Sequence, residues 1–426
     1  MISYPFPPNA SAGAVRSERF ARYLEELGWK VNVITIKPRS DLSGYNNSQY
    51  FVPNMNIHAT STLDPWLWLR EKSAKKLILR GIRSVLMRLF SFPDHMLLWL
   101  PFALKRALSI YRKEKFNAIY TTSPPHSTHL IGLILSKLTG IPLLADFRDP
   151  WTLNAYRGNS GFDKLLMKIE KIMEKAVYVN SSVILANTKA NRKNMLKTFS
   201  FIKKNKVVYL PNGWEEFTEN NIYDDKKNKQ LTIVHAGTFY PKFKPYALFY
   251  ALSAWRKGEY SKTILPLNKG DIQIILLGAK DETTKKLIME LGLEEFVIIK
   301  PWVAQAEARK YMCQADLLLA SLGTGKESST YVPSKLFEYM AAKRPVIGFF
   351  YEGESASLIN ETGIGVVFTK DEPDAIIMYL HEMIKAKENG LPVPYRPDDD
   401  KIKKYHIRSI VLKLRDNLES IINNSK

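Results

Sequence analysis

Short apolar runs rich in β-branched residues alternate with helix-period segments along nearly all of this 426-residue chain. Near-continuous apolar strands between helices are typical of parallel sheets covered on both faces. Eleven strands are predicted in two groups: 31–36, 118–122, 142–146, 182–186 and 207–210, then 231–235, 272–277, 296–299, 316–320, 345–349 and 365–368. Helices are predicted between them, for example over 15–27, 127–138, 162–179, 306–313 and 334–341. Two groups of strands favour an α/β fold of two doubly wound, Rossmann-like domains that face each other across a cleft.

The break between the two groups falls at a turn. The sequence Pro-Asn-Gly at 211–213 follows a predicted strand and precedes the polar stretch 220–230. We therefore expect an acceptor-side domain over 1–214 and a second domain over 215–400. The remaining residues, 401–426, hold a helix that we expect to pack back on the first domain. The acidic run 398–400 is interpreted as a helix N-terminal charge cluster rather than a metal site.

The charge balance calls for an acidic partner. Sixty-two Lys and Arg against 42 Asp and Glu give a net charge of +20, which suits nucleic acid, anionic lipid or a phosphorylated substrate. We expect no nucleic acid, because no recognised binding motif accompanies the charge. The single cysteine, Cys313, excludes an internal disulfide and a multi-cysteine metal site. The sequence shows neither an 18-residue apolar run nor a secretory signal pattern, so we expect a cytoplasmic protein.

Loops after the strands of the first half carry three candidates. Gly13 lies in PPNASAGAVRSERF, where a helix N-terminus favours an anion, although a structural turn fits as well. His126, in SPPHSTH, is either a proton carrier or sugar-hydroxyl partner, or a surface histidine. Arg148 and Asp149, in FRDPW, suit a phosphate and a sugar hydroxyl, or simply pair with each other.

Loops of the second half add small and basic residues. Gly237 in HAGTFYPKFKP permits close approach, and Lys242 and Lys244 place positive charge beside it, unless this is only a solvated basic loop. Another strand ends on Gly278.

An aromatic pair follows the next strand. Trp302 and Val303 stand where a planar base could pack, and ordinary core packing explains them equally well.

The segment PSKLFEY starts a helix near Ser334 and is the most informative one. Lys335 lies in the first turn and Glu338 follows three residues later. A capping box would need Glu or Gln three residues after the serine, where the chain has Phe337. A carboxylate here accepts the hydroxyls of a ribose; the alternative is a solvated helix charge.

A basic stretch over 63–115 carries 12 Lys and Arg and 4 Asp and Glu, a net +8. Its predicted helix has an apolar face beside a basic one. The sequences that flank it supply Trp66, Trp68 and Trp99. This pattern suits an anionic membrane surface, and the alternative is a helix packed on its own domain. The basic side chains concerned are Lys72, Lys75, Lys76, Arg80 and Arg83.

Taken in order, five segments resemble the retaining glycosyltransferases of family 4, which have the GT-B fold and include enzymes of bacterial surface-polysaccharide synthesis. These are YPFPPNASAGAVRSERFARYLEELGWKVNVIT, TTSPPHSTHLIGLILSKLTGIPLLADFRDPWT, VVYLPNGWEEF, HAGTFYPKFKP and VPSKLFEYMAAKRPVIG. The resemblance implies a nucleoside-diphosphate sugar, by expectation a UDP-sugar, as donor. It implies no metal and no other cofactor.

The resemblance also implies roles for individual residues. Glu338 would hold the ribose, and Lys335 with Lys242 or Lys244 would neutralise the diphosphate. Gly13 would approach the diphosphate from the first domain. Gly353, in YEGESASLI, would lie near the sugar-phosphate end.

Three departures from the family pattern stand out. The family often has two glutamates eight residues apart, and the earlier position here is Thr330. Where many members have a histidine after the strand in ADFRDPW, this chain has Arg148 and Asp149, which join His126 as catalytic candidates. The family usually opens with a strand, and Met1 falls almost at the end of that strand.

The expected function is transfer of a sugar to a lipid-linked or polysaccharide acceptor, with retention and without metal. The enzyme would be peripheral on the inner face of the cell membrane. One alternative is a UDP-sugar 2-epimerase of the same architecture. Another is a non-catalytic sugar-nucleotide or membrane-binding module, which Thr330 in place of a glutamate would suit.

Overall fold

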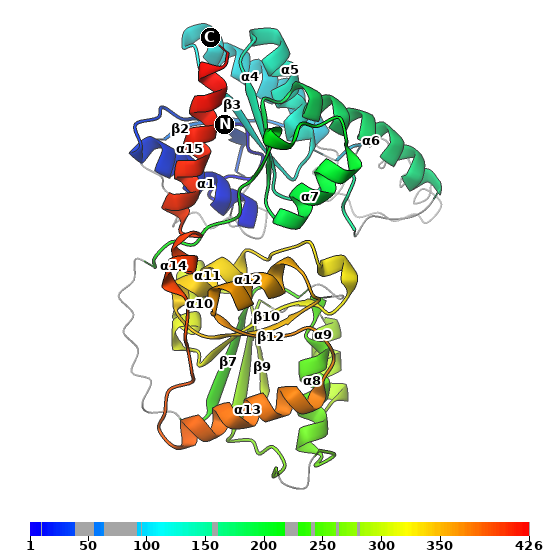
Figure 1. Ribbon diagram of the computed structural model, residues 1–426, viewed down its shortest axis with the longest axis vertical. Helices are drawn as coiled ribbons and strands as arrows, with labels where there is room; N and C mark the ends of the chain where they lie inside the picture. The colour runs from blue at the N-terminus through cyan, green and yellow to red at the C-terminus, as the bar shows by residue number, and fades with distance from the viewer. Residues whose placement is uncertain are drawn as a thin grey trace. The chain divides into compact units, whose positions relative to one another are not determined.

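The structure, a computed structural model, describes residues 1–9, 11–38, 55–63, 92–94, 96–155, 161–217, 229–239, 243–260, 264–278 and 282–425. The chain divides into two compact units (Figure 1). The first comprises Met1–Asn212 with Ile407–Lys426, and the second comprises Gly213–His406. Each unit is an α/β domain built on parallel strands.

The first unit holds four parallel strands in the order β3-β4-β5-β6 and a parallel pair, β1-β2. Ile2 bridges Ile34 of β1 and Thr121 of β3, so the N-terminal residues join the two parts. The strands are β1 (Asn32–Ile36), β2 (Asn56–Thr60), β3 (Ile119–Ser123), β4 (Leu143–Phe147), β5 (Val183–Ala186) and β6 (Val207–Tyr209). The helices are α1 (Ala12–Glu26), η1 (Leu97–Trp99), α4 (Leu100–Lys113), α5 (Ser127–Thr139), α6 (Gly161–Asn180), α7 (Lys189–Thr198), η2 (Lys204–Lys206) and α15 (Ile407–Asn423).

The second unit has one six-stranded parallel sheet in the order β12-β11-β10-β7-β8-β9. The strands are β7 (Leu231–Ala236), β8 (Ile272–Leu277), β9 (Val297–Lys300), β10 (Leu317–Gly323), β11 (Val346–Phe350) and β12 (Gly365–Phe368). The helices are α8 (Tyr246–Arg256), α9 (Glu282–Glu290), α10 (Gln305–Gln314), η4 (Lys326–Ser328), α11 (Lys335–Ala342), α12 (Glu354–Thr362), α13 (Pro373–Glu388) and α14 (Asp399–Lys403).

Burial on both faces of each sheet explains the continuous apolar strands. In β7, Ile233 belongs to one buried cluster and the next residue, Val234, to another. In β3, Ile119 and Tyr120 divide in the same way. Since successive strand residues point to opposite faces, both faces must be covered by helices. The predicted fold class, two Rossmann-like domains with parallel sheets, is confirmed.

One strand was missed, one predicted helix is divided, and one local expectation is confirmed. The strand β2 was not predicted, because one side of NIHAT is exposed and the segment lacks an apolar run. The single helix expected within 401–426 is two helices, α14 in the second unit and α15 in the first. The acidic run before it does cap a helix, since the Asp398 carboxylate accepts a hydrogen bond from the Lys401 amide.

The interpretation of Trp99 as a membrane-flanking side chain is wrong. Trp99 is fully buried, and its Nε1 donates to Thr60 Oγ1 at 2.7 Å. Residues 64–91, which include Trp66, Trp68 and the five basic residues of the predicted amphipathic helix, lie outside the described residues. None of the helices in the described ranges is both long enough and apolar enough to cross a bilayer.

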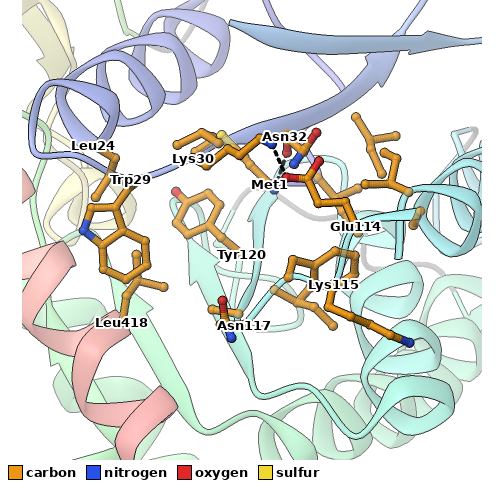
Figure 2. A pocket seen from close by; sticks show the side chains of 18 of the residues that line it. Met1, Leu24, Trp29, Lys30, Asn32, Glu114, Lys115, Asn117, Tyr120 and Leu418 are labelled. Carbon is orange, nitrogen blue, oxygen red and sulfur yellow. Dashed lines mark hydrogen bonds and ion pairs between the residues drawn. The ribbon is translucent and has the colours of Figure 1, made fainter. Parts of the chain in front are cut away.

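A cavity of about 600 Å³ lies at the amino ends of β1 and β3 (Figure 2). Figure 2 shows Trp29 and Leu418 on one side and Lys115 on the other, with Met1 between them beside Asn32. The Met1 amine donates to the Asn32 carbonyl at 2.7 Å, and burial lowers its pKa to about 5.

Candidate functional site

Two glycines end neighbouring strands of the second unit and bring their loops together. Gly237 follows β7 with φ +117° and Gly278 follows β8 with φ +80°, a backbone region that favours glycine. A Cβ atom on Gly278 would lie 3.8 Å from the Gly237 carbonyl carbon and 3.9 Å from Trp302 Cδ1. The Trp302 side chain is 48% exposed. These three predicted residues therefore form one surface at the carboxyl ends of the strands.

Lys335 places an amine beside the same turn. A Cβ atom on Gly237 would lie 3.5 Å from Lys335 Nζ. Nζ is also 3.0 Å from His235 Nε2, and His235 Nδ1 is 2.8 Å from the Leu319 carbonyl. Since a carbonyl only accepts, Nδ1 carries the proton and Nε2 accepts from the lysine. Burial lowers the pKa of Lys335 to about 7 and holds that of His235 well below its usual value.

Helix α11 presents its amino end and a carboxylate in this region. Ser334 is its N-cap residue, but its hydroxyl makes no capping hydrogen bond. Tyr339 fixes the helix against the sheet, because its hydroxyl accepts from the Ala236 amide and donates to the Leu319 carbonyl. Glu338, half-buried, lies one turn after Ser334. Lys335 and Glu338 were predicted from the sequence, whereas His235 and Tyr339 were not, because their roles depend on contacts between distant segments.

This arrangement suits an anion joined to a hydroxyl-bearing group and a planar base. A helix N-terminus and an ammonium group both attract phosphate oxygens. A bound anion also favours the charged form of Lys335. A carboxylate such as Glu338 accepts hydroxyl hydrogen bonds, and an exposed indole such as Trp302 stacks on a base.

Other predicted residues of this unit lie differently. Lys242 is outside the described residues. Lys244 is 2% exposed and its ammonium donates to Thr283 Oγ1, so the alternative of a solvated loop is wrong for this lysine. Val303 packs against the core. A Cβ atom on Gly353 would lie 2.2 Å from the Ser329 carbonyl oxygen, so backbone packing alone requires a glycine there.

In the first unit, Gly13 and Arg148 meet. A Cβ atom on Gly13 would lie 1.8 Å from Arg148 Nη1, so the guanidinium occupies the space that a side chain would fill. Gly13 is in the first turn of α1, which Ser11 caps. Asp149 Oδ2 is 3.6 Å from Arg148 Nη2. A guanidinium at a helix N-terminus is suited to an anion, as predicted for this loop.

His126 comes from the preceding loop and stacks on Trp151, with ring centroids 5.1 Å apart and planes 3° apart. Trp151 Nε1 in turn donates to Glu170 Oε2 at 2.6 Å. The two predicted loops of this unit therefore meet through Trp151. The catalytic roles of His126, Arg148 and Asp149 stay predictions.

A buried ion pair that was not predicted supports these loops. Arg16 donates from Nε and Nη2 to the two carboxylate oxygens of Asp146, at 2.9 and 3.0 Å. Its guanidinium also donates to the carbonyls of Leu210 and Pro211. Asp146 precedes the FRDPW loop by one residue, and Tyr120 also donates to it at 2.6 Å. The only sequence signal was an aspartate within an apolar strand.

Metal binding was not expected. Within the described ranges, no three His, Cys, Asp or Glu side chains group as a metal ion would need.

Comparison with known proteins adds two family matches. Residues 11–213 match a family model described as a glycosyl transferase 4-like domain, and residues 230–386 match one described as glycosyl transferases group 1. No curated protein sequence matches the chain.

Many solved structures are similar to this chain, and the three described next each cover nearly all of it. Sucrose-phosphate synthase from Thermosynechococcus elongatus has a TM-score of 0.67 at 12% identity, over 99% of this chain and 98% of that one. HepE from Anabaena, in complex with UDP, has a TM-score of 0.60 at 12% identity, over 98% of both chains. WaaG, a glycosyltransferase involved in lipopolysaccharide biosynthesis, has a TM-score of 0.60 at 13% identity, over 98% of both chains. At these identities the likeness shows the fold.

Proposed function

Because the chain is a glycosyltransferase with the GT-B fold, we propose that it transfers a sugar from a nucleoside-diphosphate donor bound by its second unit. UDP is the proposed nucleotide, which the UDP complex of HepE supports. The proposed acceptor is lipid-linked or a growing glycan, which the likeness to WaaG supports. Transfer proceeds with retention and without a metal ion.

The observation that carries this proposal is the position of Lys335. Its amine lies beside the Gly237 turn and in the first turn of α11, with the His235 ring as its hydrogen-bond acceptor. A departing diphosphate gains negative charge as the glycosidic bond breaks. An ammonium and backbone N–H groups already aimed at that charge stabilise it. Glu338 binds the ribose hydroxyls, and Trp302 packs on the base.

The acceptor chemistry is assigned to the first unit. Asp149 orients the acceptor hydroxyl or takes its proton, and Arg148 binds an anionic group at the N-terminus of α1. His126 is the second candidate for the proton, since its ring lies one stacking contact from the same loop. The enzyme works on the inner face of the cell membrane.

Calorimetry with UDP and uridine tests the donor site. Replacing Lys335 with Ala removes a charge-assisted contact worth about 1.5–3 kcal/mol, so UDP affinity falls by about tenfold to a hundredfold. Uridine lacks the phosphates and loses little. The matched control is Lys385→Ala, which removes an exposed lysine of α13. Equal losses for UDP and uridine would rule out the diphosphate assignment.

A turnover assay separates the alternatives. A transferase releases UDP in proportion to added acceptor. A UDP-sugar 2-epimerase instead converts the sugar nucleotide without acceptor, and a binding module retains the donor unchanged. Either of the last two outcomes would replace the proposed activity.

A further inference from the structure

Helix α6 has one face packed on the first unit and one face open. It contacts α5, and Val177 and Tyr178 are fully buried. Figure 1 shows α6 as a long helix along the outside of this unit.

Large apolar side chains gather on that outer face. Their exposed fractions are 56% for Leu165, 41% for Ile169, 68% for Ile172 and 54% for Val179. With 3.6 residues per turn, these positions lie within a single arc of the helix. Beyond the helix, Phe201 is 44% exposed, and the Lys175 ammonium lies 5.3 Å from its ring centroid.

A row of lysines runs beside this apolar arc. Lys164, Lys168, Lys171 and Lys175 are all exposed, at a spacing of three or four residues. The helix is therefore amphipathic within its exposed face, with an apolar strip next to a basic strip. Such a helix suits the plane of a membrane interface.

The carboxylates of α6 increase this asymmetry because two of the three point inward. Glu170 is 2% exposed and accepts from Trp151 Nε1, and Glu174 is fully buried. Tyr178 and Thr152 both donate hydrogen bonds to Glu174, and burial raises the pKa of this carboxyl group. The third, Asp163, lies in the first turn. The four lysines therefore face outward without a glutamate among them.

We propose that this face of α6 lies on an anionic lipid bilayer, with the apolar strip in the headgroup region and the lysines on lipid phosphates. The apolar strip from Leu165 to Val179 is about 21 Å long at 1.5 Å per residue. A second copy of the chain fits the face poorly when the two α6 helices are antiparallel, since that two-fold contact would set one row of lysines against the other. This contact holds the enzyme of the proposed function at the membrane, and it does not depend on the donor chemistry.

Vesicle sedimentation tests the contact with the full chain. The probes are phosphatidylcholine vesicles with and without phosphatidylglycerol, at low and high salt. We expect binding that needs the anionic lipid and weakens with salt, since headgroup attraction is screened. Replacing Lys168, Lys171 and Lys175 with Gln lowers binding at least tenfold. The matched control replaces Lys285, Lys310 and Lys385 with Gln, removes the same charge from the second unit and leaves binding within twofold.

A second variant tests the apolar strip. Ile172→Ser with Leu165→Ser lowers binding at least fivefold and leaves UDP affinity unchanged, which shows that the fold is intact. Vesicle binding equal to wild type in both α6 variants overturns the proposal, as does a wild type that ignores anionic vesicles. If the wild type is a dimer in sedimentation velocity and the Ile172→Ser and Leu165→Ser changes dissociate it, the face is assigned to self-association instead. If the wild type does not bind UDP at all, the proposed function fails, and the proposal for the α6 face is unaffected.

Discussion

At the scale of single residues, the most informative group is the Lys335 amine. The sequence shows a lysine in a helix first turn, which predicts proximity to phosphate but not its protonation. The pKa of about 7 depends on burial beside His235, which lies 100 positions earlier and across the sheet. Contacts of this kind cannot be predicted from a single sequence.

This pKa predicts a pH-dependent donor affinity. The free enzyme loses the Lys335 proton as the pH rises through about 7, whereas bound diphosphate favours the charged lysine and raises its pKa. Binding above pH 7 therefore takes up a proton, and UDP affinity falls by up to about tenfold per pH unit. Calorimetry between pH 7.5 and 9, where UDP itself is fully ionised, measures this slope. Lys335→Arg should flatten it, and an unchanged slope in that variant would exclude Lys335 as the source.

A second residue-scale prediction concerns Gly13. A methyl group there would overlap the Arg148 guanidinium, which lies 1.8 Å from the added atom, so Gly13→Ala displaces it. We expect kcat/KM for transfer to fall at least tenfold. The control, Gly161→Ala at the start of α6, has no atom within 4 Å of the added carbon and should leave kcat/KM unchanged. Full activity in Gly13→Ala would remove Arg148 from the site.

At the scale of elements, all eleven predicted strands are present, because each of them carries a short apolar run in the sequence. The twelfth, β2, lacks that signal, since its outer side is exposed. The outer face of α6 was also missed. Its lysines and apolar residues are visible in the sequence, but the burial of Glu170 and Glu174 that makes the face basic is not. The clustering of Gly237, Gly278 and Trp302 could be predicted, because loops at the carboxyl ends of parallel strands meet at one edge. The contact between Arg16 and Asp146 could not be predicted in this way.

The cavity beside Met1 makes an element-scale prediction. In the parallel register set by Ile2, residues added before Met1 would run along Asn32, Ile119 and Asn117, which line the space. Four added residues of Val and Ile, about 13 Å when extended, should fill it and raise the melting temperature by several degrees. A Gly-Ser extension of equal length is the control. Equal melting temperatures for the two extensions would contradict this.

The apolar extension also tests how the buried Met1 amine makes the stability depend on pH. With a pKa near 5 when folded and near 8 when unfolded, the amine binds a proton only in the unfolded chain between these values. The free energy of unfolding therefore falls as the pH drops from 8 to 5, by up to about 1.4 kcal/mol per pH unit. The apolar extension moves the amine out of the cavity and should reduce this slope. Urea unfolding at several pH values measures it, and identical slopes would show that the Met1 amine is not its source.

At the scale of the whole molecule, the net charge of +20 fits two anionic partners, a diphosphate at Lys335 and a lipid surface at α6. Sugar transfer from a nucleoside-diphosphate donor requires that UDP be released only when an acceptor is present. The full chain is incubated with UDP-sugars and with lipid-linked or glycan acceptors, and released UDP is measured. We expect release of UDP that requires acceptor, falls at least a hundredfold in Lys335→Ala and persists in Lys385→Ala. Release that is independent of acceptor, or equal in the two variants, would contradict it.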